Sequence, residues 1–303
     1  MGESRRGVLL GVAAYVMWGA FPLYFPLLEP AGAIEVLAHR VLWSLITMWL
    51  IVAIGRRTAA VRAVVADRRT RLLLLGAAVT ITSNWGTYIY GVTHDHVVET
   101  ALGYFINPLV TVLLGVIVLR ERLRLLQWAA LGIAAVAVLV LAVDYGHPPW
   151  IALVLAFSFG TYGLAKKSAG VGAIESLTVE TSFLAPLAIG YLAVLAAGGS
   201  STFGTEGTGH ALLLASAGVV TAVPLMCFGA AATRVPLVTL GLLQYLAPIL
   251  QFLLGITWFH ETMPTGRWIG FALVWAALVL FTVEAVRHQR RSVELGVGAS
   301  TAA

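Results

Sequence analysis

The sequence has one cysteine, Cys227, and little charge of either sign, since only 11% of its 303 residues are Asp, Glu, Lys or Arg. A single cysteine excludes a disulfide within the chain and any metal site built from cysteine pairs. Soluble domains carry about 25% charged residues, so this chain is too poor in charge to cover a soluble surface. With 59% hydrophobic residues and a mean hydropathy of +0.91, the composition indicates a polytopic membrane protein.

Several catalytic signatures are also missing. The chain has no Gly-x4-Gly-Lys loop and no Gly-x-Ser-x-Gly elbow, and His260-Glu261 lacks the second histidine of a zinc-protease motif. His94-Asp95-His96 crowds three ligand types into one short loop, which favours a solvated loop over a metal site. An intramembrane enzyme is the least favoured class because no nucleophile–base pair is visible. We expect no catalysis, no metal and no cofactor.

Long apolar runs are what the sequence has in abundance. A helix needs about 20 mostly apolar residues to span a bilayer. The first run follows Arg5-Arg6 but is too long for a signal peptide, so we interpret it as a membrane span. Together the runs predict an all-α fold of ten spans, at about 7–28, 35–54, 72–92, 97–119, 125–143, 150–165, 174–197, 211–231, 237–258 and 266–286.

The basic residues predict the orientation of these spans. With the N-terminus in the cytoplasm, every Lys and Arg except Arg40 and Arg267 falls in an inner segment, as the positive-inside rule requires. Both termini are therefore predicted to be cytoplasmic. The net charge of +5 then reflects topology, and no nucleic-acid partner is expected.

The chain repeats itself at an offset of 140 residues. Ala33-Ile34-Glu35-x-Leu37 recurs as Ala173-Ile174-Glu175-x-Leu177. Further on, the residues that recur are Pro108, Leu113, Leu114, Gly115 and Glu121, as Pro248, Leu253, Leu254, Gly255 and Glu261. Each half holds five spans, an odd number, so the second copy enters the membrane from the opposite side. We predict two inverted five-helix repeats, at 1–144 and 145–291, followed by a disordered cytoplasmic tail at 292–303.

Ionisable side chains inside a bilayer are costly and mark functional sites. Arg40 lies in the second span, and its counterpart in the seventh span is Glu180. The functional interpretation makes Arg40 an anion site or outer latch and Glu180 a cation or proton site.

A structural interpretation of these charges stays open. Glu180 can reach Lys166 or Lys167, and His39 is expected to be a hydrogen-bonded packing residue, so it is a secondary candidate. Arg40 can snorkel outward. It can otherwise pair with Glu35, Asp95 or Glu99.

Polar and aromatic residues in three spans suggest a cavity lining. Pro108 and Pro248 are predicted to kink their helices, and freed backbone is tolerated in lipid only where it is re-satisfied or lines a cavity. The alternative is interhelical hydrogen bonding and close packing, which Gly266-x3-Gly270 permits. The candidates for the lining are Asn84, Tyr88, Tyr104, Asn107, Gln244 and Tyr245, with Trp85 and Gln251 as secondary candidates.

The same motifs carry a family resemblance. The runs are Leu37-Ala38-His39-Arg40-x2-Trp43-Ser44, Asn84-Trp85-Gly86-x-Tyr88, Glu99-x3-Gly103-Tyr104-Phe105-Ile106-Asn107-Pro108-Leu109 and Gly241-x2-Gln244-Tyr245-x2-Pro248-x2-Gln251-Phe252. Over nearly the whole chain the sequence resembles the RarD proteins, often described as chloramphenicol-sensitive proteins, of the EamA-like branch of the drug/metabolite transporter superfamily. The resemblance implies a ten-helix inner-membrane carrier with an inverted five-plus-five fold.

Two classes of function follow from this pattern. The first is a secondary transporter of a small organic metabolite or drug-like molecule, working by alternating access as other inverted-repeat carriers do. It would export its substrate, driven by a proton or other ion or by exchange. The second is a non-transporting scaffold or sensor that affects drug susceptibility indirectly. Either would be a monomer or homodimer in the lipid bilayer.

Overall fold

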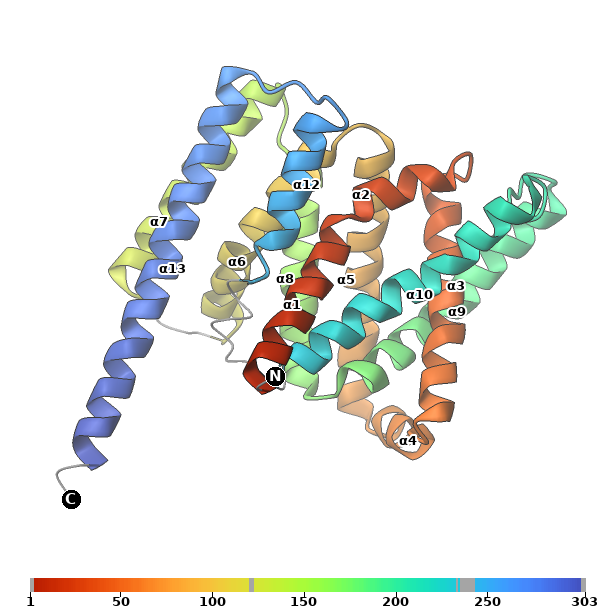
Figure 1. The fold of residues 1–303 in the computed structure, drawn as a ribbon, viewed down its shortest axis with the longest axis horizontal. Coiled ribbons are helices and arrows are strands. Elements are labelled where there is room, and N and C mark those ends of the chain that lie inside the picture. Colours follow the sequence, from red (N-terminus) through yellow and green to blue (C-terminus); the bar gives the residue numbers. More distant parts are fainter. Residues whose placement is uncertain (1–2, 120–122, 233, 235–242, 301–303) are drawn as a thin grey trace.

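The structure is a computed structural model that describes residues 3–119, 123–232, 234 and 243–300. Over these residues the chain forms a bundle of long helices without a strand (Figure 1). The short helix α4 (Thr58–Ala66) lies at the lower end of the bundle in Figure 1. We call this the α4 end; it is the end predicted to face the cytoplasm.

Most predicted spans coincide with one helix each. Seven of the described helices are long and apolar enough to cross a membrane, or eight if a bent helix pair at the start counts as one span, so the chain is a multi-pass membrane protein. The helices after the first span are α3 (Ala33–Ile54), α5 (Arg68–Thr93), α6 (Val97–Leu119), α7 (Leu125–Tyr145), α8 (Trp150–Ala169), α9 (Ala173–Ala197), α10 (Gly207–Ala232), α12 (Leu246–Thr257) and α13 (Thr265–Ser300).

The described helices differ from the predicted spans in several places. α12 is a shorter apolar helix, and the first part of the ninth predicted span, residues 237–242, lies outside the described residues. α8 covers its whole predicted span, although its apolar part is also shorter than those of the seven long helices. α13 continues well beyond residue 286, into the segment for which a disordered tail is predicted. The presence of all ten spans and the disorder of the tail stay predictions.

The first predicted span is broken instead of continuous. α1 (Glu3–Gly19) is followed by α2 (Phe21–Tyr24) and the 3-10 helix η1 (Phe25–Leu28), and the chain bends by 44° after Gly19. The cause is a pair of prolines, because Pro22 and Pro26 lack the N–H groups that would continue α1. Each proline stands in the first turn of a new short helix, where no N–H is needed.

Helices at equivalent positions in the two halves begin alike. α3 and α9 start at Ala33 and Ala173, each after a glycine and each with a glutamate in the first turn. α7 and α13 start at Leu125 and Thr265. In both cases the starts lie 140 residues apart. α3 packs along α9 and α10, while α7 packs along α13.

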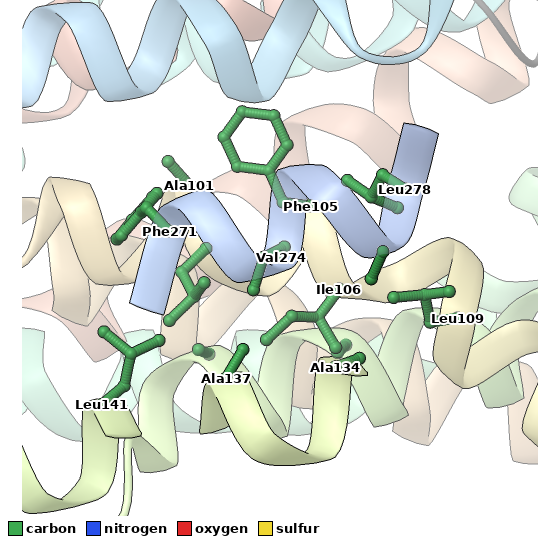
Figure 2. Close-up of a cluster of buried hydrophobic side chains, with 14 of the residues drawn as sticks. Ala101, Phe105, Ile106, Leu109, Ala134, Ala137, Leu141, Phe271, Val274 and Leu278 are labelled. Carbon is green, nitrogen blue, oxygen red and sulfur yellow. The ribbon is translucent and has the colours of Figure 1, made fainter. Parts of the chain in front are cut away.

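The largest apolar cluster holds α6, α7 and α13 together (Figure 2). Phe105 and Ile106 of α6 meet Ala137 of α7 and Val274 of α13 in this cluster. α7 and α13 approach so closely that a Cβ atom on Gly270 would overlap Leu141. The close packing predicted from Gly266-x3-Gly270 is therefore confirmed.

Candidate functional site

Arg40 lies in the interior of the bundle, on the eighth residue of α3. Only 5% of its surface is exposed, so it does not snorkel outward. Its Nε donates a hydrogen bond to Oγ1 of Thr221 on α10, at 3.1 Å. Among the described residues no carboxylate lies within 4.0 Å of the guanidinium, so none of the three predicted acidic partners pairs with it. The structure leaves this buried cation without a counter-ion from the described part of the chain.

Aromatic rings surround the Arg40 guanidinium. Its Cζ lies 4.2 Å from the ring centroid of Trp85, 5.5 Å from that of Phe21 and 5.7 Å from that of Phe25. Such cation–π contacts partly offset the loss of hydration. The break in the first span positions two of the rings, since Phe21 begins α2 and Phe25 begins η1.

Two tyrosines complete these surroundings. Tyr88 is buried, its ring lies 5.8 Å from that of Phe25, and within the described part of the chain its hydroxyl has no hydrogen-bond partner. Its ring also lies 5.7 Å from the ring of Tyr104. We call Arg40, Phe21, Phe25, Trp85 and Tyr88 the Arg40 cage.

Asn84 and Tyr104 support the cage from outside. The Tyr104 hydroxyl donates to Oδ1 of Asn84 at 3.2 Å. Asn84 Nδ2 donates to the carbonyl of Leu155 at 3.0 Å and to the hydroxyl of Ser158 at 3.1 Å. Asn84 thus joins α5 to α8, and its amide group has few hydrogen bonds left to offer.

The remaining candidates on α6 and α12 lie elsewhere. Asn107 accepts one long hydrogen bond, from Thr111 at 3.5 Å, and Tyr245 packs against the cluster of Figure 2. Gln251 donates to the carbonyl of Trp18 at 3.1 Å, which links α12 to α1. Gln244 is half-buried in the turn before α12. The contacts of these four side chains lie outside the Arg40 cage, and their role as cavity lining stays a prediction.

The structure also locates the two prolines and His39. Pro108 lies inside α6, which continues past it, whereas Pro248 is the third residue of α12, where its missing N–H interrupts nothing. The kinks at the two prolines stay predictions. His39 packs, as expected, by stacking on Phe203 at 4.8 Å. Neither of its ring nitrogens has a hydrogen-bond partner among the described residues, so the predicted hydrogen bond is not found in this part of the chain.

Glu180 occupies the equivalent position on α9 and is completely buried. It accepts hydrogen bonds from Nζ of Lys166 at 2.9 Å and from the hydroxyl of Tyr162 at 3.2 Å. Lys166 also contacts Ser176 and lies over the Tyr162 ring at 5.1 Å. Of the two interpretations of Glu180, the pairing with Lys166 is the one that the structure contains.

α3 and α9 run antiparallel and are joined at both ends. Glu35, in the first turn of α3, accepts from the backbone N–H of Thr202 at 2.8 Å, just after α9 ends. Glu175, in the first turn of α9, pairs with Arg57 at 2.9 Å, just after α3 ends. Arg40 and Glu180 therefore lie toward opposite ends of this helix pair.

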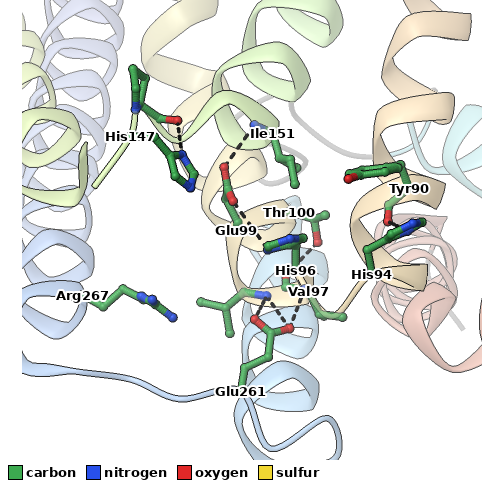
Figure 3. A network of polar contacts seen from close by, with 12 residues as sticks. Tyr90, His94, His96, Val97, Glu99, Thr100, His147, Ile151, Glu261 and Arg267 are labelled. Atoms are coloured by element: carbon green, nitrogen blue, oxygen red, sulfur yellow. Dashed lines mark hydrogen bonds and ion pairs between the residues drawn. The ribbon is translucent and has the colours of Figure 1, made fainter. Parts of the chain in front are cut away.

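A polar network fixes the end of the bundle opposite α4 (Figure 3). Glu261 accepts from the N–H of Val98 at 3.1 Å and also from that of Val97, which caps α6. Glu99 accepts from the N–H of Ile151 at 3.0 Å, which caps α8. Burial raises the pKa of Glu261 to about 7, against the lowering effect of these hydrogen bonds. The network ties α12 and α8 to the first turn of α6.

An apolar groove on the described surface is separate from these charged groups. It has a volume of about 480 Å³ and is lined by apolar side chains of α6, α12 and α13 together with Tyr245 and Thr282. Because it lacks charge and faces outward between helices, it is a poorer candidate for a polar substrate than the Arg40 cage.

The sequence predicted Arg40, Trp85 and Tyr88 of the cage but missed its other two members, Phe21 and Phe25, as well as Thr221 beside Arg40 and Tyr162 beside Glu180. Phe21 and Phe25 had a signal in the repeated Phe-Pro pairs of the first span, which mark a break. Tyr162 and Thr221 had none, because an isolated hydroxyl in an apolar span does not reveal which helix it faces.

Comparison with known proteins agrees with the motifs. Residues 5–143 match the EamA-like transporter family. The chain is 57% identical over 290 residues to Protein RarD of Streptomyces exfoliatus, covering 96% of this chain and 92% of that protein. It is 43% identical over 290 residues to Protein RarD of Escherichia coli (strain K12), covering 96% and 98%. A solved crystal structure 18% identical to the chain has a TM-score of 0.58 and covers 93% of this chain and 98% of that one, a likeness of fold alone.

Proposed function

Because this chain belongs to the RarD family of EamA-like transporters, we propose that it is a secondary transporter that moves a small organic molecule across the bacterial plasma membrane by alternating access. The observation that carries this proposal is the Arg40 cage. A buried cation without a counter-ion is costly in a membrane protein and is typical of a substrate or ion pathway. No catalytic group is required for this function, and we propose that the chain is not an enzyme.

The proposed architecture is ten spans in two inverted five-helix repeats, residues 1–144 and 145–291. The equal spacing of helix starts supports it, as does the antiparallel α3–α9 pair with its reciprocal glutamate contacts. In carriers built this way the substrate site lies between the repeats. The Arg40 cage fits that place, since Thr221 of the second half contacts Arg40 of the first.

The proposed orientation puts both termini in the cytoplasm. The α4 end carries most of the arginines, as the positive-inside rule predicts for the cytoplasmic side. The Arg40 cage then lies toward the outer side and the Glu180–Lys166 pair toward the inner side.

We assign different roles to the two charged groups. Arg40 anchors the substrate, while Glu180 couples transport to a proton or cation or acts as an inner gate, by exchanging its contact with Lys166. The position of the pair supports such an exchange of partners. Lys166 is 23% exposed and can leave toward water, while Glu180 stays fully buried and can take up a proton or cation in its place.

Solute release from proteoliposomes tests the proposal. Vesicles containing the purified protein are loaded with a bacterial small-molecule extract, and the solutes that leave are identified by mass spectrometry against protein-free vesicles. We expect a defined set of solutes to leave the wild-type vesicles, with release slowed at least about tenfold in Glu180→Gln, a loss of about 1.4 kcal/mol in transition-state stabilisation.

The matched control is Glu284→Gln, which removes another paired glutamate, the partner of Arg124. This variant should release solutes at the wild-type rate. Normal release by Glu180→Gln would exclude its coupling role. A folded wild-type protein that releases nothing would contradict transport and favour the scaffold or sensor.

A further inference from the structure

The hydrogen bonds of the Arg40 guanidinium are incomplete for a buried group. A guanidinium has five N–H donors, and among the described residues only the one on Nε has an acceptor, Oγ1 of Thr221. No carboxylate balances the charge within this part of the chain. The terminal amino groups of Arg40 are therefore free to bind an acceptor that comes from outside the protein.

Tyr88 presents a second unused donor at the same place. It is 2% exposed, and its hydroxyl has no hydrogen-bond partner among the described residues. Its ring lies 5.8 Å from that of Phe25, which in turn lies 5.7 Å from the Arg40 guanidinium. Buried hydroxyls are normally satisfied, because leaving one unpaired loses the hydrogen bonds it made in water. Two unsatisfied donors, one of them cationic, together define a site for a hydrogen-bond acceptor that carries negative charge.

The walls of the cage restrict the rest of the ligand. Trp85, Phe21 and Phe25 offer ring faces and edges, which pack well against a planar apolar body. One guanidinium and one hydroxyl match a single carboxylate or sulfonate, which arginine binds through parallel hydrogen bonds. A strongly hydrated dianion such as phosphate would bring a second negative charge, which the single cation of the cage does not balance.

We propose that the Arg40 cage binds the anionic group of an organic monoanion with an aromatic body, and that such monoanions are the substrate class of this protein. The second part of this statement rests on the proposed transport function. The first part, binding, stands on the cage alone.

Thermal stability of the detergent-purified protein tests binding. The probes are benzoate and benzenesulfonate, each compared with its neutral counterpart, benzamide or benzenesulfonamide, in a buffer whose only other anion is gluconate. We expect both anions to raise the melting temperature saturably and both amides to leave it unchanged. Equal shifts with the amides, or an equal shift with chloride alone, would overturn the proposal.

Variants locate the anion. Arg40→Gln should abolish the shift, and Arg40→Lys should weaken binding, because an ammonium group cannot make the parallel pair of hydrogen bonds. Tyr88→Phe should weaken binding about tenfold and yet stabilise the ligand-free protein, because it removes an unsatisfied hydroxyl. If Tyr88 had only a structural role, Tyr88→Phe would not weaken anion binding while stabilising the ligand-free protein. Should Arg40→Gln fail to fold, Arg40→Lys and Tyr88→Phe still decide the outcome.

The control for non-specific anion binding is Arg62→Gln, which removes an exposed arginine of α4 and should keep the full shift. An unchanged shift in Arg40→Lys and Tyr88→Phe would overturn the assignment to the cage.

Flux of benzenesulfonate, which carries a permanent charge, separates the two proposals. Binding without flux contradicts transport and leaves the anion site standing. Release of other solutes at full rate by Arg40→Lys, together with no anion shift in the wild type, overturns the anion site and leaves transport standing.

Discussion

Glu261 shows how one residue can make the stability of this protein depend on pH. Its carboxyl group caps α6, and burial raises its pKa from 4.5 to about 7. Between these two values the folded protein holds a proton that the unfolded chain has released. Folding therefore takes up a proton in this window, and by linkage the free energy of unfolding falls as the pH rises from about 4.5 to about 7.

Replacing Glu261 by Gln should remove this dependence. Gln keeps a carbonyl oxygen for the N–H groups at the start of α6 but does not titrate. We expect the melting temperature of the wild type to fall more steeply than that of Glu261→Gln between pH 5 and pH 8, as measured in detergent by a thermal-shift assay. Parallel curves for the two proteins would contradict the raised pKa.

The Lys166–Glu180 pair should be strongly coupled. Lys166→Met leaves the buried carboxylate of Glu180 without its cation, and removal of one partner of a buried pair costs roughly 3–5 kcal/mol. Glu180→Gln in the same chain should recover a large part of that loss, since no charge is then left unpaired. Unfolding of the single and double variants by denaturing detergent measures the coupling. Additive effects would show that the two side chains do not interact.

For single residues, the sequence predicted how deep in the membrane each side chain lies but not which neighbouring helix it faces. Arg40 and Glu180 stood out because each is a charge inside an apolar span, and Trp85 and Tyr88 because they follow Asn84. The residues that contact them did not stand out in the sequence, because hydropathy indicates the depth of a residue and not the helix that it faces. The three carboxylates considered for Arg40 are all occupied elsewhere or distant, and its surroundings are aromatic.

At the level of helices, the contact between α3 and α10 is sensitive to a single methyl group. A Cβ atom on Gly218 of α10 would overlap the backbone carbonyl of Trp43 on α3, which cannot rotate away. Overpacking of this kind costs roughly 1–3 kcal/mol. The contact lies on the helix that supplies Thr221 to Arg40, so it also positions the cage.

Gly218→Ala should therefore lower the melting temperature and weaken anion binding. The matched control is Gly76→Ala on α5, where the new methyl group meets no atom within 4 Å. That substitution should be neutral or stabilising by up to about 1 kcal/mol, because alanine favours the helix. If both variants melt alike, the close approach of α3 and α10 is not as described.

Helix bounds followed the hydropathy closely, but bends did not. α3, α6 and α9 begin or end within two residues of their predicted limits. The first span breaks at Pro22 and Pro26, whereas α6 runs through Pro108 unbroken. The difference depends on whether neighbouring helices hold the freed backbone, which is a property of the packed bundle.

For the whole molecule, the arrangement of the two ends across the membrane can be tested by labelling. In a Cys227→Ala background, Glu206→Cys lies at the end opposite α4 and Ala59→Cys lies on α4, both exposed. A membrane-impermeant maleimide should label the first in intact cells and the second only after permeabilisation. The reverse pattern would invert the proposed orientation, and labelling of both in intact cells would contradict a bundle that spans the membrane.

The repeat was visible in the sequence because glycine, proline and glutamate at helix ends are kept in both copies. The repeat could not predict which residues form the contacts between the two halves. The reciprocal contacts of Glu35 and Glu175 join the start of each helix to the segment after the other, a pairing that depends on the tilt of α3 against α9.

These two contacts also differ in how they respond to ionic strength. Glu35 binds a neutral N–H group, whereas Glu175 binds a guanidinium that is 50% exposed, and salt screens only attraction between charges. Osmotic shrinkage of a bacterium concentrates the salts of its cytoplasm. It would weaken the contact between α3 and α9 at the α4 end more than the contact at the opposite end, where Glu35 meets a neutral group.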